Sequence, residues 1–380
     1  MSMQPLPIDR LETPCLLVDE PRMARNIERL QTRLDRLGAS LRPHLKTCKS
    51  VEIARRLMPS VQGPATVSTL KEAEEFAAAG VRDIMYAVGL APGKLDRVLA
   101  LRRRGVDLSI IIDSREQAAA VAASSRAAGD RIPTLIEIDC DDHRAGVAPE
   151  DRILVQIGRD LHEGGAELRG VMTHAGGSYD AIGIAALERA AEEERAGTVA
   201  AAKALREAGL PCPVVSVGST PTAHFARDLT GVTEVRAGVY VFFDLVMAGI
   251  GVCSVDDIAL SVLTSVIGHQ RSKGWILVDA GWMALSRDRG TAKQAADQGY
   301  GLACDVSGTV HQDLIMIEAN QEHGILALRP GSIAALPELP VGTLLRILPN
   351  HACATAAQHE CYRATNGDLV TAVWPRFSGW

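Results

Sequence analysis

Short apolar segments alternate with longer helical stretches over the first two thirds of the chain. The helical stretches are rich in Ala, Leu and Glu. The apolar segments show little alternation between faces, which is typical of parallel strands covered by helices. The predicted strands are 39–43, 65–69, 83–87, 107–112, 133–139, 168–173, 213–217 and 232–236, and the helices between them include 71–79, 94–103, 114–128, 150–162 and 182–208.

Eight strand–helix repeats of this kind predict a (β/α)8 barrel, an α/β fold. The alternative is an open doubly wound sheet. The first strand–turn–helix unit contains no Gly-x-Gly-x-x-Gly motif to support that alternative. We therefore predict a barrel over residues 21–255.

The pattern changes after residue 255, where the long helical stretches end. Strand-like runs separated by Gly, Pro and Asn predict a C-terminal all-β domain. The apolar run 16–18 precedes the first helix and can add a strand to that domain. The predicted β-strand domain therefore comprises 1–20 and 256–380, with strands near 258–268, 275–279, 301–307, 313–318, 324–328, 343–348 and 368–374.

The composition is that of an ordinary globular protein and excludes several function classes. The 380 residues are 47% hydrophobic and carry a formal charge of −6, with no Lys/Arg-rich block for nucleic acid. No apolar run is long enough to cross a bilayer, and the first residues lack the pattern of a signal peptide. The eight cysteines show no disulfide-framework spacing. We expect a cytoplasmic protein that binds neither nucleic acid nor membranes.

The first candidate for chemistry is Lys46, in the turn between the first barrel strand and the next helix. Pro43 disfavours helix at the residue before it and helps to end the strand there. The carboxyl ends of barrel strands form the working face, and Lys46 stands there beside His44 as a candidate Schiff-base amine. A single lysine in a loop is more often just solvated, so its assignment depends on the other strand ends.

Two other strand ends carry groups suited to a phosphate. The seventh strand is followed by Gly218, Ser219 and Thr220, and the eighth by Gly238, Val239 and Tyr240. The first loop leads into a helix, whose N-terminal N–H groups bind anions, and barrel phosphate sites commonly use these two loops. Capping and turn chemistry explain either loop alone. Both loops together, opposite Lys46, indicate pyridoxal 5'-phosphate, with its aldehyde on the lysine and its phosphate in the loops.

Other strand ends supply groups that can surround the cofactor ring. Arg144 follows the fifth strand, and His174 and Tyr179 follow the sixth. Each has a purely structural alternative; Arg144, for example, can pair with Asp139 or Asp142. His174 is also a candidate helper base.

The second constellation is His351 and Cys353, in a segment predicted as extended, where residues two apart point to the same side. Imidazole and thiolate suit zinc, or manganese, cobalt or nickel. Two protein ligands leave positions open for water or substrate, as a catalytic metal requires. His359 and Cys361 repeat the same spacing, so spacing alone does not identify the site.

Together these motifs resemble the D-serine dehydratase and D-threonine aldolase family, the fold-type III relatives of alanine racemase. The resemblance covers nearly the whole chain and runs through 13–19, 42–47, 68–74, 144–147, 174–179, 218–222, 349–353 and 374–376. It implies a barrel plus a β-domain, a homodimer, pyridoxal phosphate on Lys46, and a divalent metal on His351 and Cys353 near the substrate's hydroxyl.

The resemblance implies a lyase that acts on a D-3-hydroxy amino acid of the D-threo-3-hydroxyaspartate or D-serine type. Dehydration would release a 2-oxo acid and ammonia. The alternative is retro-aldol cleavage to glycine and an aldehyde. An amino acid racemase would need a second base and no metal, and a non-catalytic pyridoxal phosphate carrier would need only the barrel. The metal motif counts against these last two functions.

Overall fold

The computed structural model describes residues 4–380, which form two compact units. The barrel unit is Arg29–Gly238 with Ser378–Trp380, and the β unit is the described chain up to Glu28 with Val239–Phe377. These units are defined by compactness. The domain limits predicted from the sequence pattern, 21–255 for the barrel, stay a prediction.

Eight parallel strands form the sheet of the barrel unit, in the order β3-β10-β9-β8-β7-β6-β5-β4. A parallel bridge between His44 and Thr66 links the two edge strands, so the sheet is a nearly closed barrel. This confirms the predicted α/β barrel. The strands are β3 (Ser40–Pro43), β4 (Ala65–Val67), β5 (Asp83–Gly89), β6 (Asp107–Ile112), β7 (Pro133–Ile138), β8 (Glu167–Thr173), β9 (Val214–Val217) and β10 (Glu234–Ala237).

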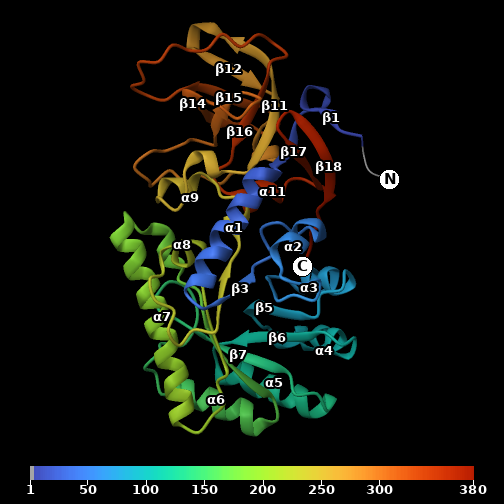
Figure 1. The fold of residues 1–380 in the computed structure, drawn as a ribbon, viewed down its shortest axis with the longest axis vertical. Helices are drawn as coiled ribbons and strands as arrows, with labels where there is room; N and C mark the ends of the chain where they lie inside the picture. The colour runs from blue at the N-terminus through green and yellow to red at the C-terminus, as the bar shows by residue number, and fades with distance from the viewer. Residues whose placement is uncertain (1–3) are drawn as a thin grey trace. The chain divides into compact units, whose positions relative to one another are not determined.

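Helices lie on the outside of these strands (Figure 1). Local signals set several of their ends: Ser114 caps α5 by accepting a hydrogen bond from the Gln117 N–H, and Gly129 ends it in the left-handed conformation at φ 63°. The helices are α1 (Glu20–Arg36), which contains the limit between the units, α2 (Val51–Leu57), α3 (Leu70–Ala78), α4 (Leu95–Arg103), α5 (Arg115–Ala128), α6 (Ile153–Gly164), α7 (Ile184–Glu207) and α8 (Thr220–Phe225).

Residues that are in register across the barrel strands share one face of the sheet. These residues are apolar on some strands and polar on the others. Met85, Ile111, Leu135 and Met172 form a buried cluster on β5 to β8, and each buried side chain of this kind contributes about 1.5–3 kcal/mol. Met172 is in register with Ser216, which is in register with Glu234. Glu234 is in register with Ser40 on β3. The strands β9, β10 and β3 therefore continue the same face with polar side chains.

Ten mostly antiparallel strands form the sheet of the β unit, in the order β1-β18-β17-β2-β11-β12-β15-β14-β13-β16, with a further pairing between β11 and β16. This confirms the predicted C-terminal all-β domain. The strands are β1 (Leu6–Pro7), β2 (Cys15–Asp19), β11 (Leu260–Gln270), β12 (Trp275–Val278), β13 (Leu302–Cys304), β14 (Val310–Ala319), β15 (Gly324–Leu328), β16 (Leu344–Leu348), β17 (Cys361–Asn366) and β18 (Leu369–Pro375).

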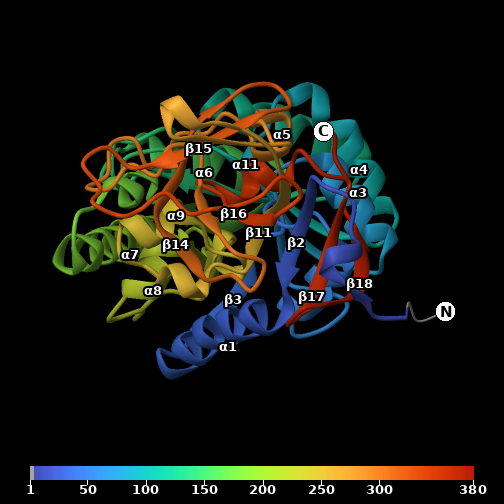
Figure 2. The same cartoon turned by 90° about the horizontal axis from the view of Figure 1, so that it is seen from above.

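The N-terminal strand β2 lies between β11 and β17, side by side with β17 and β18 in Figure 2. The sequence pattern predicted this strand but not β1 or β17. Only Tyr362 and Ala364 are apolar and buried along β17 after its first residue, which is too short an alternation to stand out.

Three short helices in the β unit were also not predicted: α9 (Leu245–Gly249), α10 (Trp282–Leu285) and α11 (Ala352–Ala356). Each has only four or five residues, so none shows a helical period in the sequence. Within residues 4–380, no helix is both long enough and apolar enough to span a membrane.

Candidate functional site

Lys46 lies just past the carboxyl end of β3, and its side chain is exposed. The backbone of this turn is tied to the neighbouring strands: the His44 N–H donates to the Ala237 carbonyl on β10, and the Leu45 N–H donates to the Thr66 carbonyl on β4. The two edge strands of the barrel thus hold the turn from both sides. Lys46 is presented from a fixed backbone at the carboxyl end of the barrel.

His44 is held neutral beside this lysine. Its Nδ1 accepts a long hydrogen bond (3.5 Å) from the Lys46 backbone N–H, and its Nε2 lies 3.4 Å from Ser68 Oγ. Burial, and then the charges of Lys46, Arg236 and nearby His174, hold the pKa of His44 well below its usual range. Sequence reasoning noted His44 beside the lysine but gave it no role.

His174 follows β8 and hydrogen-bonds through Nδ1 to the Gly218 carbonyl at 3.0 Å. Because a carbonyl only accepts, Nδ1 carries the proton and Nε2 has the free lone pair. Burial, and then nearby Lys46, Arg144 and Arg236, lower the pKa of His174 to about 3 despite that hydrogen bond. The imidazole is therefore neutral and only weakly basic.

The other two predicted ring neighbours have different surroundings. The Tyr179 ring, in the short helix 176–180, lies with its centroid 6.2 Å from that of His174, tilted by 53°. Arg144 is largely exposed and pairs with Glu137 at 3.6 Å. The structural alternative predicted for Arg144 was an ion pair with Asp139 or Asp142. The partner in the structure is instead Glu137, which lies on β7.

Arg236 is a buried cation at the end of the eighth barrel strand, to which sequence reasoning gave no role. It lies on β10, is 3% exposed, and donates to Ser216 Oγ at 2.5 Å and to the Thr173 carbonyl. Ser216 donates in turn to Glu234 at 2.6 Å. Glu-x-Arg on a short buried strand was the available signal, because charged side chains are rarely buried without partners.

The loops after β8 and β9 are joined by one buried carboxylate. Glu194 on α7 accepts hydrogen bonds from the backbone N–H groups of Ala175 and Gly218, both at 3.0 Å. Ser219 Oγ caps α8 by accepting from the Thr222 N–H, and it also contacts Ser178 Oγ at 2.9 Å. The Ser219 hydroxyl is therefore already engaged within the protein.

Thr220 is different, because its Oγ1 is buried and has no hydrogen-bond partner in the described part of the chain. An unsatisfied buried hydroxyl costs about 1–3 kcal/mol. A bound phosphate oxygen would satisfy it, so the donors of this loop fit a phosphorylated cofactor.

Gly238 allows the eighth strand end to approach the lysine turn. A Cβ there would lie 3.0 Å from Thr47 Oγ1 and 3.1 Å from the His44 carbonyl, which is tighter than most Cβ contacts. Val239 and Tyr240 follow directly and are buried in a short 3-10 helix of the β unit. Of the predicted phosphate residues, the structure brings Gly218, Ser219 and Thr220 together on one loop of the barrel unit.

We predict that Thr220→Val weakens pyridoxal phosphate binding by about 10–100-fold, the equivalent of one hydrogen bond to a charged group. Folding should be unaffected, because the replaced hydroxyl has no hydrogen-bond partner among residues 4–380. Titration of the apoprotein with cofactor measures the effect. Thr134→Val, at the amino end of β7, is the control and should bind like the wild type. Unchanged affinity in Thr220→Val would contradict a phosphate at this hydroxyl.

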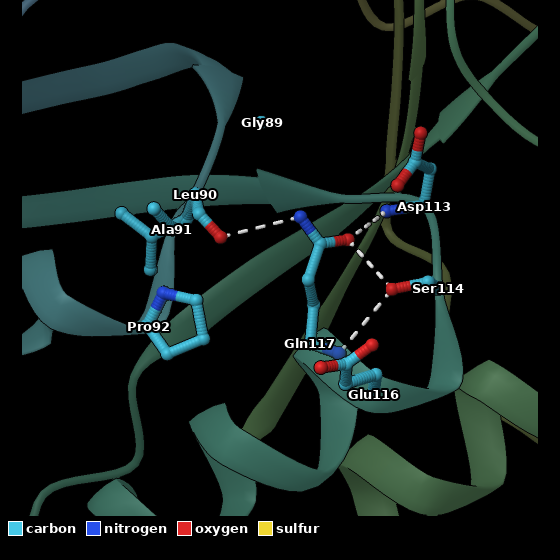
Figure 3. Close-up of a pocket in the computed structure, with 8 residues that line it drawn as sticks. All are labelled: Gly89, Leu90, Ala91, Pro92, Asp113, Ser114, Glu116 and Gln117. Carbon is cyan, nitrogen blue, oxygen red and sulfur yellow. Dashed lines mark hydrogen bonds between the residues drawn. The ribbon is translucent and has the colours of Figure 1, made fainter.

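A separate hollow of about 410 Å³ opens at the carboxyl ends of β5 and β6 (Figure 3). Gln117 bridges these ends: its amide oxygen accepts from the Asp113 N–H at 2.9 Å and its amide nitrogen donates to the Leu90 carbonyl at 3.2 Å. The lining consists of Gly89, Leu90, Ala91, Pro92, Asp113, Ser114, Glu116 and Gln117. Its carboxylates are unsuited to an anionic phosphate.

The metal-ligand candidates lie together in the β unit. His351 is the N-cap residue of α11 and Cys353 is the second residue of that helix. The two side chains are hydrogen-bonded, and His351 Nδ1 lies 2.8 Å from Asp288 Oδ2. Burial would lower the pKa of His351, but Asp288 and Cys353 together raise it to about 11.

The extended geometry predicted for this pair is therefore wrong. The backbone is extended only at His351 (φ −137°, ψ 106°) and turns into helix at Ala352. The turn at a helix N-cap brings the two side chains together, where strand alternation had been expected to do so. His359, of the second His-x-Cys pair, is bonded instead to the Ala284 carbonyl at 2.9 Å.

Two aspartates that sequence reasoning missed hold the ligand segment. Buried Asp244 accepts from the Ala352 N–H at 2.9 Å and the Met247 N–H at 3.0 Å. Asp288 contacts His351 directly. The His351 imidazole and the Cys353 thiol, with the Asp288 carboxylate on Nδ1 of the imidazole, form a donor set that fits zinc or a similar divalent cation.

The family models match both units. Residues 18–246 match the alanine racemase N-terminal domain, and residues 259–365 match a putative serine dehydratase domain. The chain is 57% identical to D-threo-3-hydroxyaspartate dehydratase of Delftia sp. (strain HT23), over 97% of this chain and 98% of that protein. It is 29% identical to the D-serine dehydratase of Dictyostelium discoideum, over 95% of each chain.

Solved structures have the same fold. A C353A mutant of D-threo-3-hydroxyaspartate dehydratase in the metal-free form superposes with a TM-score of 0.96 and 56% identity, covering 99% of this chain and all of that one.

Proposed function

This chain belongs to the alanine racemase-like family that includes D-threo-3-hydroxyaspartate dehydratase, and from that membership we propose that it dehydrates a D-3-hydroxy amino acid to a 2-oxo acid and ammonia. The substrate we propose is D-threo-3-hydroxyaspartate, with D-serine as a related one. The cofactors are pyridoxal phosphate and a divalent metal.

The barrel unit supplies the cofactor-binding side. We propose that Lys46 Nζ binds the cofactor's aldehyde carbon and that the loop of Gly218, Ser219 and Thr220 binds its phosphate. The chemistry that pyridoxal phosphate supplies when bound is an electron sink for the substrate's α-carbon. The Lys46 amine is the group of this chain that would take the substrate's α-proton.

The neutral imidazole of His174 supports a positioning role. Its Nδ1–H is committed to the Gly218 carbonyl, and a pKa of about 3 makes it a poor proton acceptor near neutral pH. We therefore propose that His174 orients the bound molecules together with Tyr179 and Arg144. Proton abstraction stays with Lys46.

The β unit supplies the metal-binding side. His351 and Cys353 are the protein ligands that we propose. The chemistry that a divalent cation supplies on such ligands is Lewis acid assistance to a departing hydroxyl group, which is otherwise a poor leaving group. Loss of that hydroxyl with the α-proton gives an enamine, whose hydrolysis releases the 2-oxo acid and ammonia.

The observation that carries this proposal is the His351–Cys353 pair with Asp288 on the imidazole. A racemase or a cofactor carrier has no use for a divalent cation. We further propose a homodimer, which the family resemblance implies, and a cytoplasmic location, which the scattered free cysteines support.

A substrate panel tests the proposal. The purified enzyme with pyridoxal phosphate and Mn²⁺ is given D-threo-3-hydroxyaspartate, D-erythro-3-hydroxyaspartate, D-serine and D-threonine, with their L-enantiomers as controls. We expect oxaloacetate and ammonia from D-threo-3-hydroxyaspartate in equal amounts, and slower pyruvate formation from D-serine. Glycine with an aldehyde as the main products would establish the aldolase alternative instead, and interconversion of enantiomers without either product would establish a racemase.

A further inference from the structure

Asp288 lies in the loop between α10 and β13, and both of its carboxylate oxygens are committed. Oδ1 accepts the Gly290 N–H at 2.8 Å, and Oδ2 meets His351 Nδ1 at 2.8 Å. The loop's own backbone thus fixes the carboxylate that contacts the imidazole. This contact joins residues 63 positions apart in the chain.

The contact selects one form of the imidazole. An ionised carboxylate has only acceptor oxygens, so Nδ1 must carry the hydrogen. Nε2 is then the nitrogen that offers a lone pair to a cation once it has lost its proton. Carboxylates that contact a ligating histidine in this way fix its tautomer and ring orientation and raise its basicity toward the metal.

Asn350, the residue directly before the candidate ligand His351, also holds this loop. Its side-chain amide donates to the Asp288 carbonyl at 3.0 Å and to the Gly299 carbonyl at 2.7 Å, and its oxygen accepts from Thr291 Oγ1 at 3.0 Å. Asn350 is 2% exposed. The residue immediately before the ligand therefore ties down both ends of the loop that carries Asp288.

Holding the loop in place would not by itself require a charged residue at Asp288. Asn350 and Thr291 already join the loop to the ligand segment through neutral hydrogen bonds. Asp288 is half-buried and adds a charged group whose Oδ2 is directed at the imidazole nitrogen. Asp297, on the same loop, pairs with Arg289 at 2.7 Å and accepts from the Gly299 N–H at 2.9 Å, so it supports the loop without touching His351.

We propose that Asp288 is a positioning residue for the metal ligand His351. It holds the Nδ1–H of His351 so that Nε2 faces the cation, and Asn350 keeps the loop of Asp288 in place. This inference rests on the proposed function, because it assumes that His351 binds the metal.

The test compares Asp288→Asn with Asp297→Asn in the full-length enzyme loaded with pyridoxal phosphate. Competition with a chromophoric chelator measures the Mn²⁺ and Zn²⁺ affinities, and long-range ¹H–¹⁵N spectra of the Zn²⁺-loaded enzyme report which nitrogen of His351 carries the hydrogen. For Asp288→Asn we expect about 10–100-fold weaker metal binding and a mixture of tautomers, since an amide can donate to Nδ1 as well as accept from it. Asp297→Asn should match the wild type in both measurements, and both variants should melt near the wild-type temperature.

Two results would overturn the inference, and they are distinguishable. If Asp288→Asn binds metal as tightly as the wild type and keeps its tautomer, Asp288 does not position His351, and the proposed function stands. If the wild type itself binds no divalent cation, the metal-dependent function and this inference fail together.

Discussion

Replacing Lys46 by alanine is expected to lower dehydration by at least about 10²–10⁴-fold, the usual contribution of a positioned proton-transfer group. Lys46 is the lysine that the two edge strands of the barrel hold at its carboxyl end. The variant should fold normally, because the Lys46 side chain is exposed. The measurement is oxaloacetate formation from D-threo-3-hydroxyaspartate at saturating cofactor.

Borohydride reduction of the wild-type enzyme provides an assay that does not depend on activity. Peptide mapping should find the reduced cofactor on Lys46 and should find none bound covalently in Lys46→Ala. Lys71→Ala is the matched control, because Lys71 pairs with Glu75 on its own helix. It should keep both the label and the activity. A label on Lys49 or Lys71 in the wild type would refute the assignment.

Removal of the metal, by chelation or by His351→Ala, is expected to stop 2-oxo acid formation while the protein stays folded. Lewis acid assistance is worth several kcal/mol, so we expect a loss of at least about 10²-fold. The fold should persist because structural zinc sites normally use four protein ligands, whereas the described residues bring together two candidate ligands, His351 and Cys353. The ligand segment is also held by protein groups: Asp244 accepts a hydrogen bond from the Ala352 N–H, and the Asn350 side chain donates one to the Gly299 carbonyl.

The metal-removal experiment needs a control histidine variant and a measurement of folding. His359→Ala is the control, because His359 has the same spacing to a cysteine but is bonded to a backbone carbonyl. It should keep its metal and its activity. Adding Mn²⁺ should restore the chelated wild type but not His351→Ala, and the circular dichroism of all samples should agree. Full activity in the metal-free enzyme would refute the proposed mechanism.

The barrel could be predicted from the sequence because its signals are local. Most of the eight strands are apolar runs between helix-forming stretches, and each predicted strand lies within a residue or two of the observed one. The polar side chains at their carboxyl ends then lie on one face by the geometry of the fold. Lys46, His174 and the loop beginning at Gly218 could be selected in this way.

Other features have no local signal. The strand β17 is stabilised by pairing with β2 and β18, which come from distant parts of the chain. The helix α11 has five residues and depends on its tertiary contacts, including the Asp244 carboxylate, 108 positions away from Ala352. Short helices gain too few internal hydrogen bonds to form on their own.

The sequence by itself determined the fold class and the residue types of the two candidate sites, because periodicity and short motifs carry both. The tertiary structure decided which groups surround those residues. It placed Arg236 against Ser216, joined the loops at Ala175 and Gly218 through Glu194, and set Asp288 on the imidazole of His351. The protonation states and hydrogen-bonding roles at both sites follow from burial and from partners that only folding brings together.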